Sequence, residues 1–422
     1  MSDVDKRTQR AIILYFSGVR LADISTHAQV EALVKQGVSV ELQPIPITGL
    51  QAQYYQIFSG RLPAHFGFFD TLMPLCRLPR LQQGADGYTV VEEYAGRDAP
   101  PKMLPELLRA AGWTVDYEDC TSTELLASLR RLTQGQDSFP ACKIIKCSMD
   151  REVLSSPSIV DEVLQIARSW VGETGLLALL SESQSAPVER FVNINNFLAE
   201  MGVIERNEQT GQINWSNSLA YFAGHGQLWV NLLGRDPQGA VYPQDEYEEV
   251  RDTLVKALPT KLRNADTGAQ VIERVYRKEE LYSSEYLFCA PDLVVVFKPG
   301  YAPSPRSTHL AFDQETFSRP AVGTTALAGV HPSLVGGFLL ASAPPLLSGL
   351  SAHEPAPLTA VVPTVLHALG VRYADMDSSA LSTLFVPSYL ETYPILASVQ
   401  HEGLSEEDEE LVINRLRDLG YV

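Results

Sequence analysis

The sequence predicts an α/β fold with a mostly parallel central sheet and helices on both faces. Short apolar runs recur along the chain, helical stretches separate them, and the first run ends at a Ser-Gly pair typical of a strand-to-helix turn. Strands of a parallel sheet are buried on both faces and therefore read as continuous apolar runs. With 422 residues, 45% of them hydrophobic, the chain can bury a large core.

Four apolar runs are expected to form strands. The first, residues 11–16, reads AIILYF and ends at Ser17-Gly18, and residues 25–35 follow with the pattern of a helix. The other runs are residues 175–180, 293–297 and 338–341. Ligand sites in parallel sheets form where strands end, so functional residues are expected directly after these runs.

A more polar stretch, residues 205–285, is predicted to be an inserted cap region. It contains the turn sequence DPQG and a charged helical segment, residues 245–258. Residues 1–204 and 286–403 would then form the α/β core. Residues 404–422 are predicted to form an amphipathic C-terminal helix, because Ser405 and Asp408 have the spacing of a capping box.

Charge and composition restrict the partners. The chain has 51 acidic and 33 basic residues, a net charge of -18, which disfavours nucleic acid, and we expect a protein partner or a small-molecule ligand. No apolar run reaches about 18 residues, so no membrane insertion is expected. The polar N-terminal segment and the five cysteines without a CxxC pair suggest buried thiols in a reducing compartment, so we predict a cytoplasmic protein.

Several motifs carry a family resemblance. They are LWVNLLGRDPQG at 228–239, APDL at 290–293, KPGY at 298–301 and VPTVLHALGV at 362–371. In this order and spacing they resemble the type I phosphodiesterase/nucleotide pyrophosphatase branch of the alkaline phosphatase superfamily. The resemblance covers most of residues 175–422 and extends more weakly to FSGRLPAHFGFFD at 58–70. It implies the fold described above and a site in which Asp and His hold two divalent metals that activate a Thr or Ser nucleophile.

Two of the implied metal positions hold other residues. Where the family has Asp-Gly after the first strand, this chain has Ser17-Gly18, and a serine hydroxyl does not replace the charge of a carboxylate. Where the family has Ser-Asp-His-Gly, the chain reads SESQ at 181–184. Glu182 can still bind a metal, but Ser183 replaces the companion histidine.

The remaining family positions are also altered. Alignment places Thr325-Ala326-Leu327 on the Gly-Asp-His segment, and His331 lies four residues later. His65 lies beside the position where the family has its histidine. Thr48 resembles the nucleophile in a Pro-x-Thr motif, although alignment from Ser59-Gly60 gives Leu50 instead. No histidine lies three or four residues from Asp150 or Asp161, the two aspartates of the segment 142–161.

Two main interpretations follow. The first is a protein that has lost the dinuclear metal site and its cofactor and serves a noncatalytic binding or assembly role. The alternative is a divergent hydrolase of phosphodiester or nucleotide-like substrates with a rebuilt site. That site would use Thr48 or Ser17 as the nucleophile and Glu182, His331 or His65 to hold zinc or another divalent metal. A metal-free enzyme is a third possibility, because a Ser-His-Asp triad assembles only in space.

Overall fold

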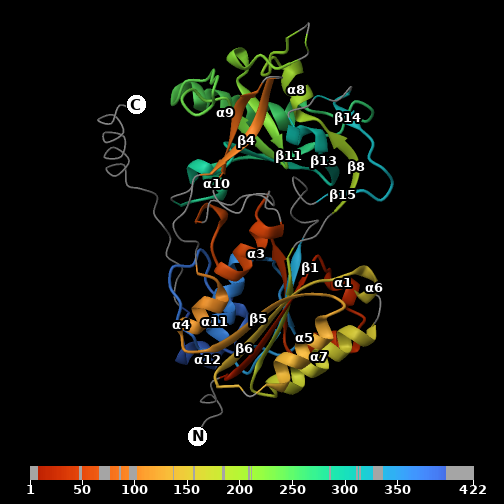
Figure 1. Ribbon diagram of the computed structural model, residues 1–422, viewed down its shortest axis with the longest axis vertical. Helices are drawn as coiled ribbons and strands as arrows, with labels where there is room; N and C mark the ends of the chain where they lie inside the picture. Colours follow the sequence, from red (N-terminus) through yellow and green to blue (C-terminus); the bar gives the residue numbers. More distant parts are fainter. Residues whose placement is uncertain are drawn as a thin grey trace, which may run out of the picture.

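The chain forms two lobes, drawn one above the other in Figure 1. The computed structural model describes residues 8–46, 50–65, 77–84, 87–94, 102–135, 137–154, 157–182, 186–207, 210, 212–284, 287–309, 312, 315–326 and 336–395.

The lower lobe is built on an eight-stranded sheet. Its strands are, in spatial order, β17 (Leu350–Ser351), β2 (Val38–Gln43), β16 (Gly337–Ser342), β7 (Leu176–Ser181), β1 (Arg10–Ser17), β6 (Ala141–Ser148) and β5 (Thr114–Thr121), with β18 (Ala356–Pro357) also paired to β2. Strand β1 pairs in parallel with β6 and β7, and β5 pairs in parallel with β6. Only β16 runs antiparallel, against β2 and β7. The predicted mostly parallel sheet is confirmed.

Helices cover both faces of this sheet. Successive side chains of β1 point to opposite faces and therefore enter two different buried clusters. Ile12 and Phe16 belong to one buried cluster, and Ile13 and Tyr15 belong to the other. The first cluster packs under α1 (Leu21–Ile24), α2 (Ala28–Gln36), α5 (Leu125–Gln134), α6 (Arg151–Leu154) and α7 (Pro157–Val171). The second packs under α3 (Leu50–Ser59), α4 (Leu104–Ala110), α11 (Val361–Ala368) and α12 (Pro387–Thr392).

The upper lobe contains two smaller sheets. One is antiparallel, in the order β11 (Ile272–Arg277), β12 (Leu293–Phe297), β10 (Gln227–Val230) and β9 (Ala220–Gly224). The other contains β13 (Gly300–Pro303), β8 (Ala186–Val192), β14 (Phe317–Ser318) and β15 (Thr325–Ala326). The helices of this lobe are α8 (Ile194–Glu200), α9 (Asp245–Lys261) and α10 (Lys278–Leu281).

The remaining elements are short. The strands β3 (Arg77–Gly84) and β4 (Gly87–Tyr94) form a separate two-stranded ribbon. The 3-10 helices are η2 (Pro63–His65), η3 (Trp215–Asn217), η4 (Leu287–Cys289), η5 (Pro305–His309), η7 (Leu358–Ala360) and η8 (Ser382–Leu384).

All four apolar runs form strands, but residues 293–297 belong to the upper lobe rather than the central sheet. Alternate residues of β12 enter two different buried clusters, so the strand is covered on both faces and its sequence is continuously apolar. The upper lobe runs from β8 to β15, a wider stretch than the predicted insertion 205–285. The predicted domain boundaries stay predictions, and residues 404–422 lie outside the described residues.

The cysteines agree in part with the expectation of buried thiols. Cys120, Cys142 and Cys147 are free and buried, whereas Cys289 is disulfide-bonded. Burial raises the pKa of the Cys142 thiol well above its usual range, so this group stays protonated. Within the described part of the chain, no helix has both the length and the apolar character needed to span a bilayer.

A buried ion pair holds the upper lobe together. The guanidinium of Arg235 donates to both carboxylate oxygens of Asp292, at 3.0 and 2.9 Å, and Asp292 is fully buried. The same carboxylate accepts the backbone N–H of Val230 at 2.8 Å and the hydroxyl of Tyr247 at 2.8 Å. These contacts join β10, β12 and α9, which come from distant parts of the chain.

We predict that Asp292→Asn lowers the free energy of unfolding by about 3 kcal/mol, because it removes the carboxylate that binds both terminal nitrogens of the buried Arg235 guanidinium and leaves Asp236 as its charged partner among the described residues. Urea denaturation measures the loss. The control is Glu31→Gln, which removes an exposed pair with Lys35 and should cost no more than about 0.5 kcal/mol. Equal effects of the two substitutions would contradict the structural role of the buried pair.

Candidate functional site

The candidate site lies at the carboxyl edge of the central sheet, where β1 and β7 end. The two strands are parallel neighbours, so Ser17, the last residue of β1, lies opposite Glu182, the first residue after β7. The Ser17 hydroxyl donates a short hydrogen bond to Oε1 of Glu182. The backbone N–H of Gly18 donates to the same oxygen at 3.2 Å, with Gly18 at a φ of 74° that favours glycine. The structure therefore joins two residues that the sequence placed at this edge.

Glu182 is fully buried, and this determines its protonation. Burial raises the pKa of its carboxyl above the usual range, and the hydrogen bond from Ser17 opposes part of the rise. Its second oxygen, Oε2, accepts no hydrogen bond within the described part of the chain. The neighbouring Tyr15 hydroxyl has a pKa raised by burial and by the charge of Glu182. A carboxyl in such a place is favoured in its neutral form unless a cation compensates it.

Aromatic rings pack directly beside this pair. The ring of Tyr15 lies 5.4 Å from that of Tyr54 and 5.5 Å from that of Phe58, both on α3. The rings of Tyr54 and Phe58 lie 4.6 Å apart. The helix that leads away from the expected nucleophile position thus places apolar surface against the end of β1.

The same edge carries a lysine that the sequence reasoning missed. Lys146, on β6, forms an ion pair with Asp119 at 2.7 Å, and its ammonium lies 5.2 Å from the centre of the Tyr54 ring. Burial lowers the pKa of Lys146, but the hydrogen bond and charge of Asp119 raise it more, and the charge of Glu182 adds to the rise. The available signal was the pair of lysines inside the apolar run ACKIIKCS.

His65 belongs to a different set of contacts. Its Nε2 lies 2.9 Å from Oδ1 of Asp377, and its Nδ1 lies 3.0 Å from the Ser284 hydroxyl. Asp377 also accepts the backbone N–H of Leu62 at 2.5 Å and lies 3.5 Å from the guanidinium of Arg61. Both ring nitrogens of His65 are therefore engaged by partners other than Glu182.

The other candidates do not add to the edge. Thr48 and His331, together with Ser183, lie outside the described residues. Asp150 accepts a hydrogen bond from the Ser122 hydroxyl at 2.5 Å, and Asp161 accepts the backbone N–H of Gln29 at 2.8 Å. These two acids have structural partners.

The described residues do not fit a dinuclear metal site. No group of three or more His, Cys, Asp or Glu side chains converges to hold an ion in the described ranges. At the ends of β1 and β7, Glu182 is the carboxyl that the described residues supply, and its Oε1 is already bound by Ser17 and Gly18. Two divalent ions need several charged ligands, whereas Asp119 is already paired with Lys146 and Asp150 with the Ser122 hydroxyl.

We predict a pH-dependent effect of Glu182→Gln on stability. The folded protein holds the Glu182 proton more tightly than the unfolded chain, whose glutamate pKa is about 4.3. Stability of the wild type therefore falls as pH rises from that value through the raised folded pKa, and it stays lower above it. Glutamine does not ionise, so the variant gains relative to wild type as pH rises.

Urea unfolding at a series of pH values from about 4 to 8 measures this difference. Glu173→Gln, at an exposed position, is the control and should give a difference that stays near zero across the series. A difference between Glu182→Gln and wild type that does not change with pH would contradict the raised pKa.

Comparison with known proteins supports the fold. No family model and no curated protein sequence matches the chain. The solved structure of human ectonucleotide pyrophosphatase/phosphodiesterase 5 (ENPP5) aligns with a TM-score of 0.53 and 11% identity, covering 91% of this chain and 99% of that one. The murine ENPP5 structure, an inactive variant in complex with AMP, aligns with a TM-score of 0.50 and 12% identity, covering 86% and 96%.

These identities are too low to carry an activity, but the coverage extends over both lobes. In its fold, the chain is similar to these ectonucleotide pyrophosphatase/phosphodiesterase structures.

Proposed function

We propose that this chain is a noncatalytic binding protein that keeps a phosphodiesterase fold and has lost the dinuclear metal site. One observation carries the proposal: the Ser17 hydroxyl and the Gly18 N–H bind the Glu182 carboxyl at the edge where the family places its metals. The serine replaces a ligand and at the same time supplies a hydrogen bond to the remaining acid. Two donors therefore hold Oε1 of the acid without an ion, while Oε2 accepts no hydrogen bond within the described residues.

The charge balance supports this proposal. A metal that bound Glu182 would need the buried carboxyl ionised and its bond to Ser17 broken, and burial opposes the ionisation. The fixed ammonium of Lys146 would also repel an incoming cation. The rings of Tyr15, Tyr54 and Phe58 already pack against the end of β1.

The bound partner is a protein or a small molecule under this proposal. The AMP complex of the murine neighbour supports a small-molecule role for a protein of this fold. The cytoplasmic location stays a prediction, and the disulfide at Cys289 favours an oxidising compartment instead, since such bonds persist there.

The test combines metal analysis with an assay. Protein purified without chelator is analysed for bound metals and then assayed with bis-p-nitrophenyl phosphate and added zinc, manganese or magnesium. We expect no stoichiometric metal and no turnover, because the described residues of the edge do not supply the ligands for two ions. Glu182→Ala should leave both readings unchanged.

About two metals per chain, with turnover that Glu182→Ala abolishes, would overturn the proposal. That result would support the alternative of a divergent hydrolase that cleaves phosphodiester or nucleotide-like substrates. In that alternative, Thr48 or Ser17 would be the nucleophile.

A second candidate function is metal-free hydrolysis by Ser284. The contacts of His65 favour it, because Nε2 lies 2.9 Å from Oδ1 of Asp377 while Nδ1 can accept the Ser284 proton. In the serine protease triad, Nε2 accepts the serine proton and Nδ1 faces the aspartate, whereas here the two nitrogens exchange places. A neutral imidazole offers one donor and one acceptor in either arrangement. The noncatalytic reading of the same contacts is a clamp that joins three distant segments of the chain.

A fluorophosphonate probe separates these readings. If Ser284 is a nucleophile, its oxygen forms a bond to phosphorus, fluoride leaves, and the proton passes to His65. Labelling would then be lost in Ser284→Ala and in His65→Ala, and kept in the neighbouring Ser283→Ala control. The leading proposal predicts no labelling of the wild type, with the three residues acting as a clamp.

A further inference from the structure

A large groove lies on the upper lobe, away from the Ser17–Glu182 pair. Its volume is about 1050 Å³, and it is bounded by β8, α8, the end of α9 and residues 315–319. Neither Ser17 nor Glu182 lines it. A groove of this size can hold a small molecule, because ligand pockets commonly measure about 300–1,000 Å³.

The charge of the groove is opposite to that of the chain. Five of its lining residues are basic and three are acidic, whereas the whole chain carries a net charge of -18. The basic residues are Arg190, Lys261, Arg263, Arg306 and Arg319. An excess of positive side chains in a concave surface concentrates field lines and attracts anions.

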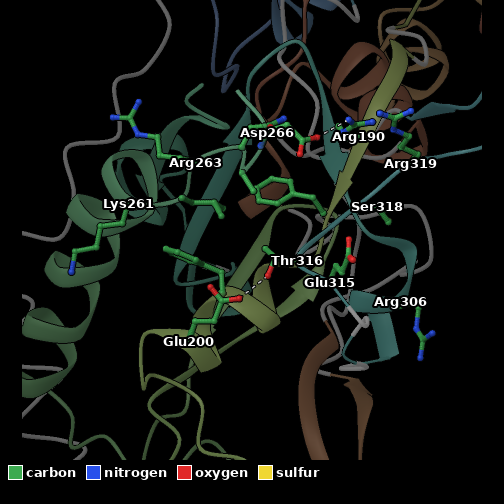
Figure 2. Close-up of a pocket in the computed structure, with 15 residues that line it drawn as sticks. Arg190, Glu200, Lys261, Arg263, Asp266, Arg306, Glu315, Thr316, Ser318 and Arg319 are labelled. Atoms are coloured by element: carbon green, nitrogen blue, oxygen red, sulfur yellow. Dashed lines mark hydrogen bonds and ion pairs between the residues drawn. The ribbon is translucent and has the colours of Figure 1, made fainter. Parts of the chain in front are cut away.

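Two arginines lie at one end of the groove. Figure 2 shows the guanidinium groups of Arg190 and Arg319 at the same end, with Asp266 beside Arg190, while Lys261, Arg263 and Arg306 project from the rim. Arg190 and Asp266 form an ion pair at 3.1 Å, and Arg319 makes no ion pair within the described residues. Arginine forks bind phosphate and carboxylate groups through paired hydrogen bonds.

The existing ion pair is a weak competitor for such a ligand. The Asp266 side chain is 71% exposed, whereas that of Arg190 is 21% exposed. An exposed carboxylate gains little from pairing in water and can swing away when a stronger anion arrives. The backbone of Arg190 belongs to β8, so its side chain starts from a fixed point beside the groove.

Apolar side chains line the adjoining part of the groove. Phe197 from α8 is 8% exposed, and Phe317 from β14 is partly buried. A ligand that carries an aromatic or apolar body beside its charged group would cover this surface and gain from burying it. The groove therefore combines a charged end with an apolar wall.

We infer that this groove binds a small organic anion, a phosphate group attached to an apolar body, with Arg190 and Arg319 holding the phosphate. A phosphate dianion suits two guanidinium groups better than a single carboxylate does, because it offers more charge and more acceptor oxygens. An extended nucleic acid does not suit the groove, since Glu200, Asp266 and Glu315 lie among its cations. This inference names the class of ligand for the proposed binding role. It rests on that role in one respect, which is that the ligand is bound and not converted.

Calorimetric titration with phenylphosphonate tests the inference. Its carbon–phosphorus bond resists hydrolysis, so turnover at the sheet edge adds no heat to the titration. We expect binding at low ionic strength that is tighter than that of inorganic phosphate and of benzoate. Arg190→Gln and Arg319→Gln should each raise the Kd about tenfold, and Asp266→Asn should lower it.

The matched control is Arg274→Gln, which removes the same charge from an exposed arginine of the upper lobe that lies outside the groove. This variant should bind as the wild type does. No binding of phenylphosphonate at any ionic strength would overturn the inference, and so would an Arg274→Gln effect as large as that of Arg190→Gln. Equal affinity for benzoate would overturn the assignment of a phosphate group.

Discussion

A carboxyl buried between two parallel strands must meet a cation or keep its proton, and this constraint determines the central site. At the edge of this sheet, Glu182 lies in a fully buried position. Here the Ser17 hydroxyl and the Gly18 N–H donate hydrogen bonds to one of its oxygens, and burial raises the pKa of the carboxyl, which favours its neutral form. Lys146 and the rings of α3 then pack close to the end of β1, where bound ions and substrate would otherwise need space.

The same constraint explains why the sequence resemblance survives in the upper lobe. Arg235 and Asp292 belong to the quoted motifs GRDPQG and APDL, and they form the buried pair that joins β10, β12 and α9. Changing one partner alone leaves a buried charge without compensation, so such a pair resists single substitutions. These motifs therefore report the packing of the upper lobe.

The sequence predicted much of the fold because burial leaves a direct pattern. β1 and β7 read as continuous apolar runs, and Ser17 and Glu182 were found because they follow those runs. β12 has the same pattern but lies in another lobe. An apolar run shows that a strand is covered on both faces, but it does not show which elements cover it. The contact of Ser284 with His65 spans 219 residues, and no local signal predicts it. Pairing across such distances is decided by tertiary packing alone.

A binding role away from the sheet edge follows from how the charges are distributed. The edge holds a carboxyl of raised pKa next to a lysine already paired with Asp119, so its charges are largely satisfied internally. The groove on the upper lobe is different, because Arg319 makes no ion pair within the described residues and Arg190 has only an exposed partner. A charged side chain without a close counter-charge can attract a ligand of opposite charge. The chain therefore retains its capacity for anions on the lobe that the metal chemistry does not use.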